Sequence, residues 1–527
     1  MKGKALSIPV RSVCKNSRKM RVLNRGPVSF CIAAALTLSA FLNTSSASQI
    51  GVASGKATID GRPLVWKTRD YISRPNNEVY YNTNYKYKFI SIVNAGGTWA
   101  WMGVNEKGFA ILNSNAEDLP SGSSGLSNGP FMRYALGNCA TVADLERLLD
   151  STNVTGRQTH ANFGAIDSTG AAAIFETGGN QYWKFDANDS SQAPDGWIVR
   201  TNFAVNGGGS AGIERYRRSV KLISDFYSGD SLNYRSIIRS QMRDFSDFES
   251  NPVPVPYPHQ WRPDRPFGYI YTYVSLCRST SVSAVAIQGV LPGESARLST
   301  MWTLLGQPAS TIAVPYWPVG KPPAEANGNP TAPLCDVSIK IRSLLFDYED
   351  NSHYIDSYKL LDGLGGGLWT QTFPVEDSIF TAAETVLEQW RRDIPPAGLM
   401  LETEASFARY ALSSLQQAYE VMSTSITTAP AEAVITDPVL RQNYPNPFNT
   451  RTVIGIDLPR RSKVKLAVYN LLGREIATLV NENMNAGSYS ISWDGTDDRG
   501  EAVASGIYLY KLESKDRIQT RKLLLMK

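Results

Sequence analysis

The sequence predicts an α+β protein, with a large layered domain followed by a small all-β sandwich. Before residue 424, short apolar strands alternate with segments whose apolar residues recur at helical spacing. After residue 439 only short alternating strands remain, separated by turn residues. This second pattern is typical of a small β-sandwich, here of about 85 residues.

The composition is that of an ordinary soluble protein. The chain has 527 residues, of which 42% are hydrophobic and 19% charged, so we expect two or three domains. Residues 1–47 carry eight basic and no acidic side chains, and the remainder has 45 basic against 48 acidic ones. A mature protein with a net charge of about −3 gives no reason to expect a nucleic-acid partner.

The N-terminus predicts an export signal. Residues 28–42 form an apolar run of 15, too short to span a bilayer, with basic residues before it and the small residues Ser45, Ser46 and Ala47 after it. Translation could start at Met1 or Met20. No later apolar run is long enough to span, so we expect a secreted or surface-tethered product. Cleavage after Ala47 makes Ser48 the first residue of the mature chain.

The first half of the large domain reads mainly as strands. A Ser/Gly-rich loop is expected over 117–129, and a capping box at Thr141–Asp144 predicts a helix over 141–151. The expected strands cover 63–70, 98–104, 109–112, 162–166, 173–176 and 197–202.

Helices become more frequent in the second half. A glycine loop at 207–209 leads into a helix that carries Ile213, Tyr216, Val220 and Ile223, and residues 228–265 form a Pro-rich excursion. Strands are expected at 281–287 and 310–314. Two further helices carry the apolar positions Ile379, Ala383, Val386, Leu387 and Trp390, and then Phe407, Tyr410, Leu415, Ala418 and Met422.

Neither a cofactor nor a metal is expected. The glycine loop at 207–209 lacks the Lys-Ser/Thr of a phosphate-binding loop. The three histidines, His160, His259 and His353, form no recognisable triad, and no paired cysteines or HExxH are present. Cys139, Cys277 and Cys335 could form one disulfide with one thiol left over, or three buried thiols, and Cys139 is expected to be structural.

The C-terminal module resembles the sorting domain of type IX secretion cargo. The matching motifs are Asn443–Asn449, Val468–Gly473, Trp493–Gly495 with Gly500, Ala504–Tyr508, and the closing Arg521–Lys527. The resemblance covers about 440–527. It implies export to the periplasm, passage across the outer membrane, and the type IX secretion machinery as a partner. A plain Ig-like binding domain is the alternative.

The large domain resembles N-terminal-nucleophile amidases, the group of choloylglycine hydrolase, penicillin V acylase and acyl-coenzyme A:6-aminopenicillanate acyltransferase. Several short segments in the right order carry the resemblance over about 48–320, and they imply an αββα sandwich. The matching segments are Ser48–Ala53, Trp66–Asp70, Asn105–Asn115, Val199–Asn202 and Glu214–Arg218.

The resemblance implies five catalytic residues. Ser48 takes the nucleophile position, Asp70 the aspartate position and Asn115 the oxyanion position, with Asn113 as the fallback. The remaining two are Asn202 and Arg215. Two positions depart from the family: Ser48 stands where these relatives have Cys, and Lys67 stands where the bile-salt branch has Arg.

An N-terminal serine carries its own base. Its hydroxyl is a weak nucleophile that needs an adjacent proton acceptor, and an α-amine with a pKa near ~7.7–8.0 suits that role at neutral pH. We therefore expect acyl transfer: Ser48 Oγ attacks an amide carbonyl, and Asn115 and Asn202 stabilise the oxyanion. Asp70 would hold the α-ammonium, and Arg215 would bias the local field and orient Asp70 or the amine.

The leading hypothesis is a secreted amidohydrolase for linear, non-peptide amides such as N-acyl amines or N-acyl amino acids. A dipeptidase of the related N-terminal-nucleophile group stays open, because residues 55–61 keep its Gly-Lys-Ala-Thr-like stretch. An inert binding protein on the same fold is the third reading, and a homo-oligomer is possible. The expected organisation is a signal peptide, an enzyme domain, a linker and a sorting domain, over 1–47, 48–424 (core 48–320, helical extension 336–424), 425–438 and 439–527.

Overall fold

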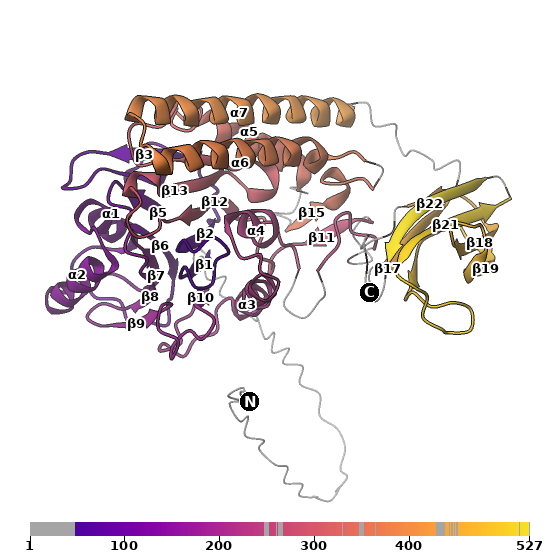
Figure 1. Cartoon of the computed structure of the whole chain (residues 1–527), viewed down its shortest axis with the longest axis horizontal. Helices are drawn as coiled ribbons and strands as arrows, with labels where there is room; N and C mark the ends of the chain where they lie inside the picture. Colours follow the sequence, from indigo (N-terminus) through magenta and orange to yellow (C-terminus); the bar gives the residue numbers. More distant parts are fainter. Residues whose placement is uncertain are drawn as a thin grey trace, which may run out of the picture. The chain divides into compact units, whose positions relative to one another are not determined.

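The computed structural model (Figure 1) describes most of the chain after the predicted signal. The described residues are 48–246, 252–259, 261, 267–328, 330–346, 353–363, 365–427 and 438–525, without 442, 444, 445, 447, 449–451 and 516. The predicted signal at 1–47, residues 428–437 of the predicted linker, part of the 443–449 motif and the last two residues of the C-terminal motif lie outside the described residues.

The large domain is built on two antiparallel sheets. The first has six strands in the order β10-β1-β2-β12-β13-β14. Its strands are β1 (Ser48–Ala53), β2 (Leu64–Asp70), β10 (Trp197–Arg200), β12 (Ser281–Gln288), β13 (Thr300–Leu305) and β14 (Val314–Tyr316). The strand β1 therefore lies between two partners: residues 50–53 pair with both β2 and β10, and Ser48 at its end pairs with Arg69 of β2.

The second sheet is a seven-stranded meander in which each strand pairs with the next along the chain. Its strands are β3 (Asn77–Asn82), β4 (Phe89–Asn94), β5 (Met102–Asn105), β6 (Ala110–Asn115), β7 (Ala161–Ile166), β8 (Ala172–Thr177) and β9 (Tyr182–Asp186). The capping box is present at Thr141 as predicted, and the helix after it runs Val142–Thr155, past the expected end at residue 151.

Helices cover the outer faces of both sheets. On the seven-stranded sheet lie α1 (Asn128–Asn138) and α2 (Val142–Thr155). Against the six-stranded sheet pack α5 (Pro333–Leu345), α6 (Leu368–Arg392) and α7 (Ala397–Thr427), which run side by side (Figure 1). These four layers confirm the expected αββα sandwich.

Apolar side chains fill the space between the sheets. A Cβ on Gly164 would lie 3.2 Å from Val52 Cγ1 and 3.4 Å from Val65 Cγ2, so the sheets approach closely at this point. Since directly opposed residues of an antiparallel pair share a face, Val52 and Val65 show that this face of β1 and β2 points towards the other sheet. Ser48 lies on the same face, because side chains alternate along β1.

Smaller elements connect the layers. Helix α3 (Ile213–Ser228) follows the glycine loop and packs against β10. A short turn α4 (Tyr234–Ser236) continues into a π-helical turn at Ile237–Gln241. Strands β11 (Tyr269–Tyr271) and β15 (Tyr354–Asp356) form a separate two-stranded sheet.

Three sequence predictions about single elements were wrong. The strand expected at 98–104 begins at Met102, and the residues before it form a loop. The loop expected at 117–129 ends where α1 begins, at Asn128. The strand expected at 310–314 is mostly irregular, because Gln307 caps a 3₁₀ turn at Pro308–Ser310 and β14 starts only at Val314.

The C-terminal domain is an Ig-like β-sandwich. Its sheets are β16-β17-β20 and β19-β18-β21-β22. The strands are β16 (Val439–Leu440), β17 (Thr452–Leu458), β18 (Ser462–Tyr469), β19 (Glu475–Met484), β20 (Gly487–Trp493), β21 (Gly506–Ser514) and β22 (Ile518–Leu525). Trp493 and Tyr510 are buried in its core. This confirms the expected all-β fold of the second domain.

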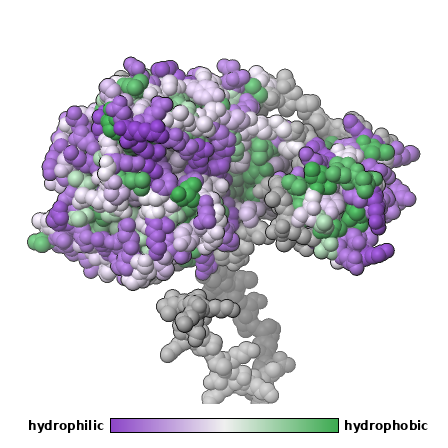
Figure 2. Space-filling view, in the orientation of Figure 1, coloured by the Kyte–Doolittle hydropathy of each residue, from purple (hydrophilic) through white to green (hydrophobic). Residues whose placement is uncertain are grey.

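Figure 2 shows that the visible face of the large domain is mostly hydrophilic. No helix in the described part of the chain is long and apolar enough to cross a membrane.

Cys139, Cys277 and Cys335 are buried free thiols, and burial raises the pKa of each to about 12. Of the two alternatives for the cysteines, the structure therefore has three buried thiols and not a disulfide.

Candidate active site

Ser48 is the first residue of β1 and is buried, with 4% of its surface exposed. Its nitrogen donates a hydrogen bond to Asn202 Oδ1 at 3.0 Å, across 154 residues of sequence. The Ser48 hydroxyl has no hydrogen-bond partner among the described residues.

Asn202 and Arg215 form a bonded unit around Ser48. Arg215 Nη1 donates to the Ser48 carbonyl at 3.0 Å, and its Nη2 donates to Asn202 Oδ1 at 2.7 Å. Asn202 Oδ1 thus accepts from both the Ser48 nitrogen and a guanidinium. Arg215 comes from the first turn of α3, and Asn202 from the loop after β10, so two segments converge on one residue of β1.

Asn115 joins this unit through its backbone. The Asn202 amide donates from Nδ2 to the Asn115 carbonyl at 3.1 Å, which ties the end of β6 to the loop after β10. Asn115 Oδ1 accepts from Asn128 Nδ2 at 3.0 Å, at the start of α1. The structure therefore brings four of the five expected residues together: Ser48, Asn115, Asn202 and Arg215.

Asp70 lies close to this unit but does not bond it. Side chains alternate along β2, so Asp70 points to the face opposite that of Arg69, the residue paired with Ser48. Its carboxylate accepts from Ser281 Oγ at 2.6 Å and pairs with Arg278 Nη1 at 3.4 Å. The acceptor at the Ser48 nitrogen is the Asn202 amide, a contact that the sequence pattern did not assign.

Asn113, the fallback for Asn115, has a different partner. Its Oδ1 accepts from Lys67 Nζ at 2.8 Å, and the same ammonium donates to the Trp101 carbonyl at 3.0 Å. Burial lowers the pKa of Lys67 well below its ordinary value, and the nearby Arg69 charge lowers it further. The Asn113 side chain is therefore bonded to Lys67, whereas the Asn115 carbonyl is bonded to Asn202.

Two carboxylates, one buried and one partly exposed, hold the loop that carries Asn202, and the sequence reading missed both. Glu176 is fully buried and accepts from Arg200 Nε at 2.7 Å and from the backbone nitrogens of Val205 and Asn206 at 2.9 and 3.0 Å. Asp118 accepts from the Ala204 nitrogen. An acid that satisfies several backbone donors fixes a loop in one conformation, but no local sequence signal marks such residues.

The site is rich in positive charge. Burial, and then the charge of Arg278, lower the pKa of Arg215 to about 10. Burial lowers the pKa of Arg69 to about 9. Both guanidiniums lie beside Ser48, Arg215 through its bond to the Ser48 carbonyl and Arg69 as the register partner of Ser48 on β2.

The described residues contain no group of three or more His, Cys, Asp or Glu side chains placed to hold a metal ion.

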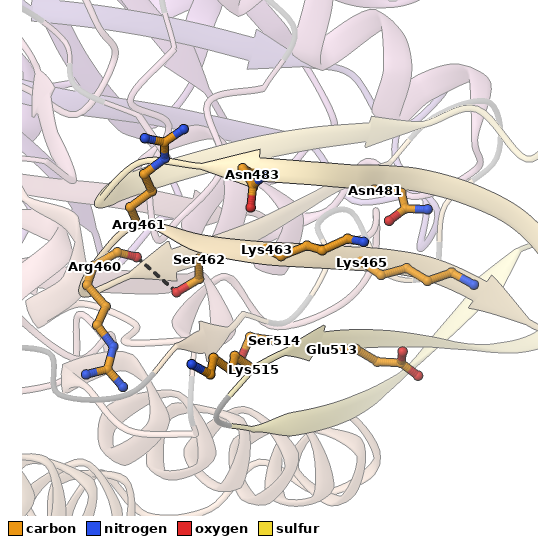
Figure 3. A pocket seen from close by; sticks show the side chains of 10 residues that line it. All are labelled: Arg460, Arg461, Ser462, Lys463, Lys465, Asn481, Asn483, Glu513, Ser514 and Lys515. Carbon is orange, nitrogen blue, oxygen red and sulfur yellow. Dashed lines mark hydrogen bonds between the residues drawn. The ribbon is translucent and has the colours of Figure 1, made fainter.

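A groove of about 1040 Å³ lies on the four-stranded sheet of the C-terminal domain (Figure 3). Lys463 and Lys465 project from β18 into it, and Ser462 Oγ donates to the Arg460 carbonyl at 3.2 Å. The other lining residues are Arg461, Asn481, Asn483, Glu513, Ser514 and Lys515.

Comparison with known families gives two matches. Residues 57–255 match the sequence model of the acyl-coenzyme A:6-aminopenicillanic acid acyl-transferase family, and residues 447–517 match that of the FlgD Ig-like domain. The first match includes four of the five site residues: Asp70, Asn115, Asn202 and Arg215. No curated protein matches the chain.

Several solved structures are similar to parts of the chain. Penicillin V acylase from Agrobacterium tumefaciens is 14% identical over 51% of this chain and 85% of that one, with a TM-score of 0.30. The Caenorhabditis elegans orthologue of N-acylethanolamine-hydrolyzing acid amidase is 14% identical over 47% and 95%, with a TM-score of 0.31. Dimeric latent PorU from Porphyromonas gingivalis is 20% identical over 18% of this chain, and the chain spans only 10% of PorU, with a TM-score of 0.16.

The stacked antiparallel sheets between helical layers are the αββα fold expected for the large domain, and residues 57–255 match the acyl-transferase family model. The expectation of an enzyme that acts on carbon–nitrogen bonds other than peptide bonds is confirmed.

Proposed function

We propose that the mature protein hydrolyses linear, non-peptide amides with Ser48 as its N-terminal nucleophile. The observation that carries this proposal is the bond from the Ser48 nitrogen to Asn202 Oδ1, with Arg215 bonded to both residues. Cleavage after Ala47 would turn this nitrogen into an α-amine at the same place. Hydroxyl and base would then belong to one residue.

The proposed reaction proceeds through an acyl-enzyme. Ser48 Oγ attacks the amide carbonyl carbon and passes its proton to the α-amine, which forms a tetrahedral oxyanion and an ammonium. The ammonium returns the proton to the leaving nitrogen, the carbon–nitrogen bond breaks, and an ester on Ser48 remains. Water then attacks the ester with the α-amine as base, and the acid and the regenerated Ser48 are released.

The other site residues have separate roles in this proposal. The side-chain amides of Asn115 and Asn202 donate to the oxyanion, where one such donor is typically worth about 10²–10³ in kcat. Asn202 also holds the α-amine through Oδ1, and Arg215 fixes Asn202 and the Ser48 backbone. Asp70 has an indirect role: it pairs with Arg278 and holds that guanidinium near Arg215.

A dipeptidase and an inert binding protein remain alternatives, and one panel separates all three. The mature protein and its Ser48→Ala variant are assayed on N-acyl amines, N-acyl amino acids and dipeptides. We expect the native chain to release acid from the acyl amides and the variant to lose at least about a thousandfold in kcat/KM. Activity only on dipeptides favours the second reading, activity on none favours the third, and activity that survives in Ser48→Ala moves the site elsewhere.

We further propose that the chain is exported through the type IX secretion machinery. The apolar run at 28–42 and the sorting-type motifs after residue 440 support this. Deletion of residues 439–527 should leave the enzyme domain in the periplasm, whereas the full chain should reach the cell surface or the medium. Equal distribution of the two chains would contradict the sorting role.

A further inference from the structure

Two buried cations lie next to Ser48 without a carboxylate partner. Arg69 is the register partner of Ser48 on β2, and Lys67 lies two residues earlier on the same face, so both point between the sheets. Each is only 2% exposed. Buried charges in proteins are normally paired, because the cost of removing an ion from water is several kcal/mol.

The bonds of these cations go to neutral oxygens. Lys67 Nζ donates to the Trp101 carbonyl and to Asn113 Oδ1. Arg69 Nη1 donates to Asn77 Oδ1 at 2.6 Å, and Arg69 Nη2 is buried with no hydrogen-bond partner among the described residues. Neither forms an ion pair within the described part of the chain, which leaves one guanidinium nitrogen and the charge of Arg69 uncompensated.

The nearest acid does not neutralise them. Asp70 follows Arg69 directly, and its charge acts on both cations from a distance. Its oxygens, however, are bonded to Ser281 and Arg278 on the opposite face of β2. The charge balance between the sheets is therefore positive beside the expected nucleophile.

Aromatic rings cover the unpaired guanidinium. Arg69 Cζ lies 5.1 Å from the Tyr71 ring centroid and 4.6 Å from that of Trp101. Both rings are partly exposed, and Trp101 meets the 56% exposed Trp99 edge to face at 6.5 Å. The aromatic rings interact with the Arg69 guanidinium, but they supply no anion for its charge. Movement of one of these partly exposed rings would uncover the guanidinium.

We propose that Arg69, assisted by Lys67, forms a subsite that binds a carboxylate of the amide substrate beside Ser48. The inference rests on the proposed function and names its substrate class. A carboxylate accepts two hydrogen bonds from a guanidinium in a fixed geometry, so it satisfies the orphaned Nη2 and compensates the buried charge. The carboxylate can belong to the amine part of the substrate, as in an N-acyl amino acid, or to the acyl part, as in the monoamide of a dicarboxylic acid.

Matched probes distinguish these two sources. N-hexanoylglycine carries the carboxylate on the amine side, and N-hexanoylglycinamide is its neutral counterpart. The N-(2-hydroxyethyl) monoamide of adipic acid carries it on the acyl side, and N-(2-hydroxyethyl)hexanamide is neutral. The chain beginning at Ser48 is compared with Arg69→Gln, with the conservative Arg69→Lys, and with Arg217→Gln, which removes an exposed arginine of α3.

The expected result is a loss confined to one carboxylate probe. Arg69→Gln should reduce kcat/KM for that probe about tenfold to a hundredfold, the usual range for a hydrogen bond to a charged group, and should change its neutral counterpart less than twofold. Arg69→Lys should restore part of the loss, and Arg217→Gln should change nothing. Equal losses on charged and neutral probes, or none on either, would overturn the subsite.

A binding measurement keeps the subsite and the activity apart. Calorimetry on Ser48→Ala, alone and combined with Arg69→Gln, reports whether the carboxylate probes bind through Arg69 when no turnover is possible. Arg69-dependent binding by a chain that hydrolyses nothing supports the subsite and refutes the proposed function. Hydrolysis with no Arg69-dependent binding refutes the subsite and leaves the proposed function intact.

Discussion

Asn202→Asp is the change that most sharply examines the role of the Ser48 α-amine. It keeps an acceptor at the position of Oδ1, 3.0 Å from the Ser48 nitrogen and 2.7 Å from Arg215 Nη2, and adds a negative charge. That charge favours the ammonium form of the amine, so the amine pKa rises. An opposite charge at this range typically moves a pKa by about one to three pH units, and Arg215 keeps the effect from being larger.

The consequence for activity has a definite sign. A free α-amine titrates near ~7.7–8.0, and only its neutral form accepts the Ser48 proton. Raising that pKa moves the acid limb of kcat/KM to higher pH, so activity at pH 7 should fall about tenfold to a thousandfold and recover at alkaline pH. Asn202→Asp also loses the Nδ2 donor assigned to the oxyanion, which adds a pH-independent reduction of about a hundredfold to a thousandfold, so the recovery at alkaline pH is partial.

The assay is the pH profile of kcat/KM between pH 5 and 10 for the chain beginning at Ser48. Asn202→Ala is the matched control, because it removes both the Oδ1 acceptor and the Nδ2 donor without adding charge, and it should lower the whole profile with little change in its acid limb. An Asn202→Asp enzyme that stays active with its acid limb in the native position would refute the α-amine as the base.

Two further predictions concern stability. Glu404 is buried, one of its oxygens accepts from the Trp317 nitrogen at 3.2 Å, and burial raises its pKa well above the ordinary value. The Glu404 carboxyl therefore loses its proton at lower pH in the unfolded chain than in the folded chain, so the free energy of unfolding falls as the pH rises above ~4.3. Glu404→Gln removes this loss, so it should raise the Tm at pH 8 more than at pH 5. Glu176→Ala leaves Arg200 unpaired in the core and should cost roughly 3–5 kcal/mol in urea denaturation, whereas Asp225→Ala, which breaks an exposed pair, should cost about 0.5 kcal/mol or less. A Glu176 variant as stable as the Asp225 variant would show that the buried pair does not hold this region.

The sequence predicted those helices and strands whose ends are marked by neighbouring residues in the chain. The capping box at Thr141 fixed the start of α2, because Thr141 and Asp144 satisfy each other's backbone donors. Helix α1 was missed behind a Ser/Gly-rich lead-in, although Pro130 in its first turn was an available signal. The β-branched run at 310–314 indicated a strand, but tertiary packing placed a 3₁₀ turn and a later strand there.

The candidate site could be predicted only in part, because its contacts join distant segments. The resemblance placed Ser48, Asn202 and Arg215, and the structure brings them together. It could not indicate that the Asn202 amide, rather than Asp70, meets the Ser48 nitrogen, since that depends on which face of β2 Asp70 occupies. The unpaired charge at Arg69 became visible only once its neighbours were known, because sequence alone does not record a missing partner.

The most direct test of Ser48 as an N-terminal nucleophile is peptide mapping of the active protein after turnover is quenched in acid. We expect trypsin to release a peptide running from Ser48 to Lys56, a fraction of which carries the mass of the substrate's acyl group on the Ser48 hydroxyl. An active chain whose N-terminus lies elsewhere, or an acyl group attached to a different residue, would contradict an N-terminal Ser48 nucleophile.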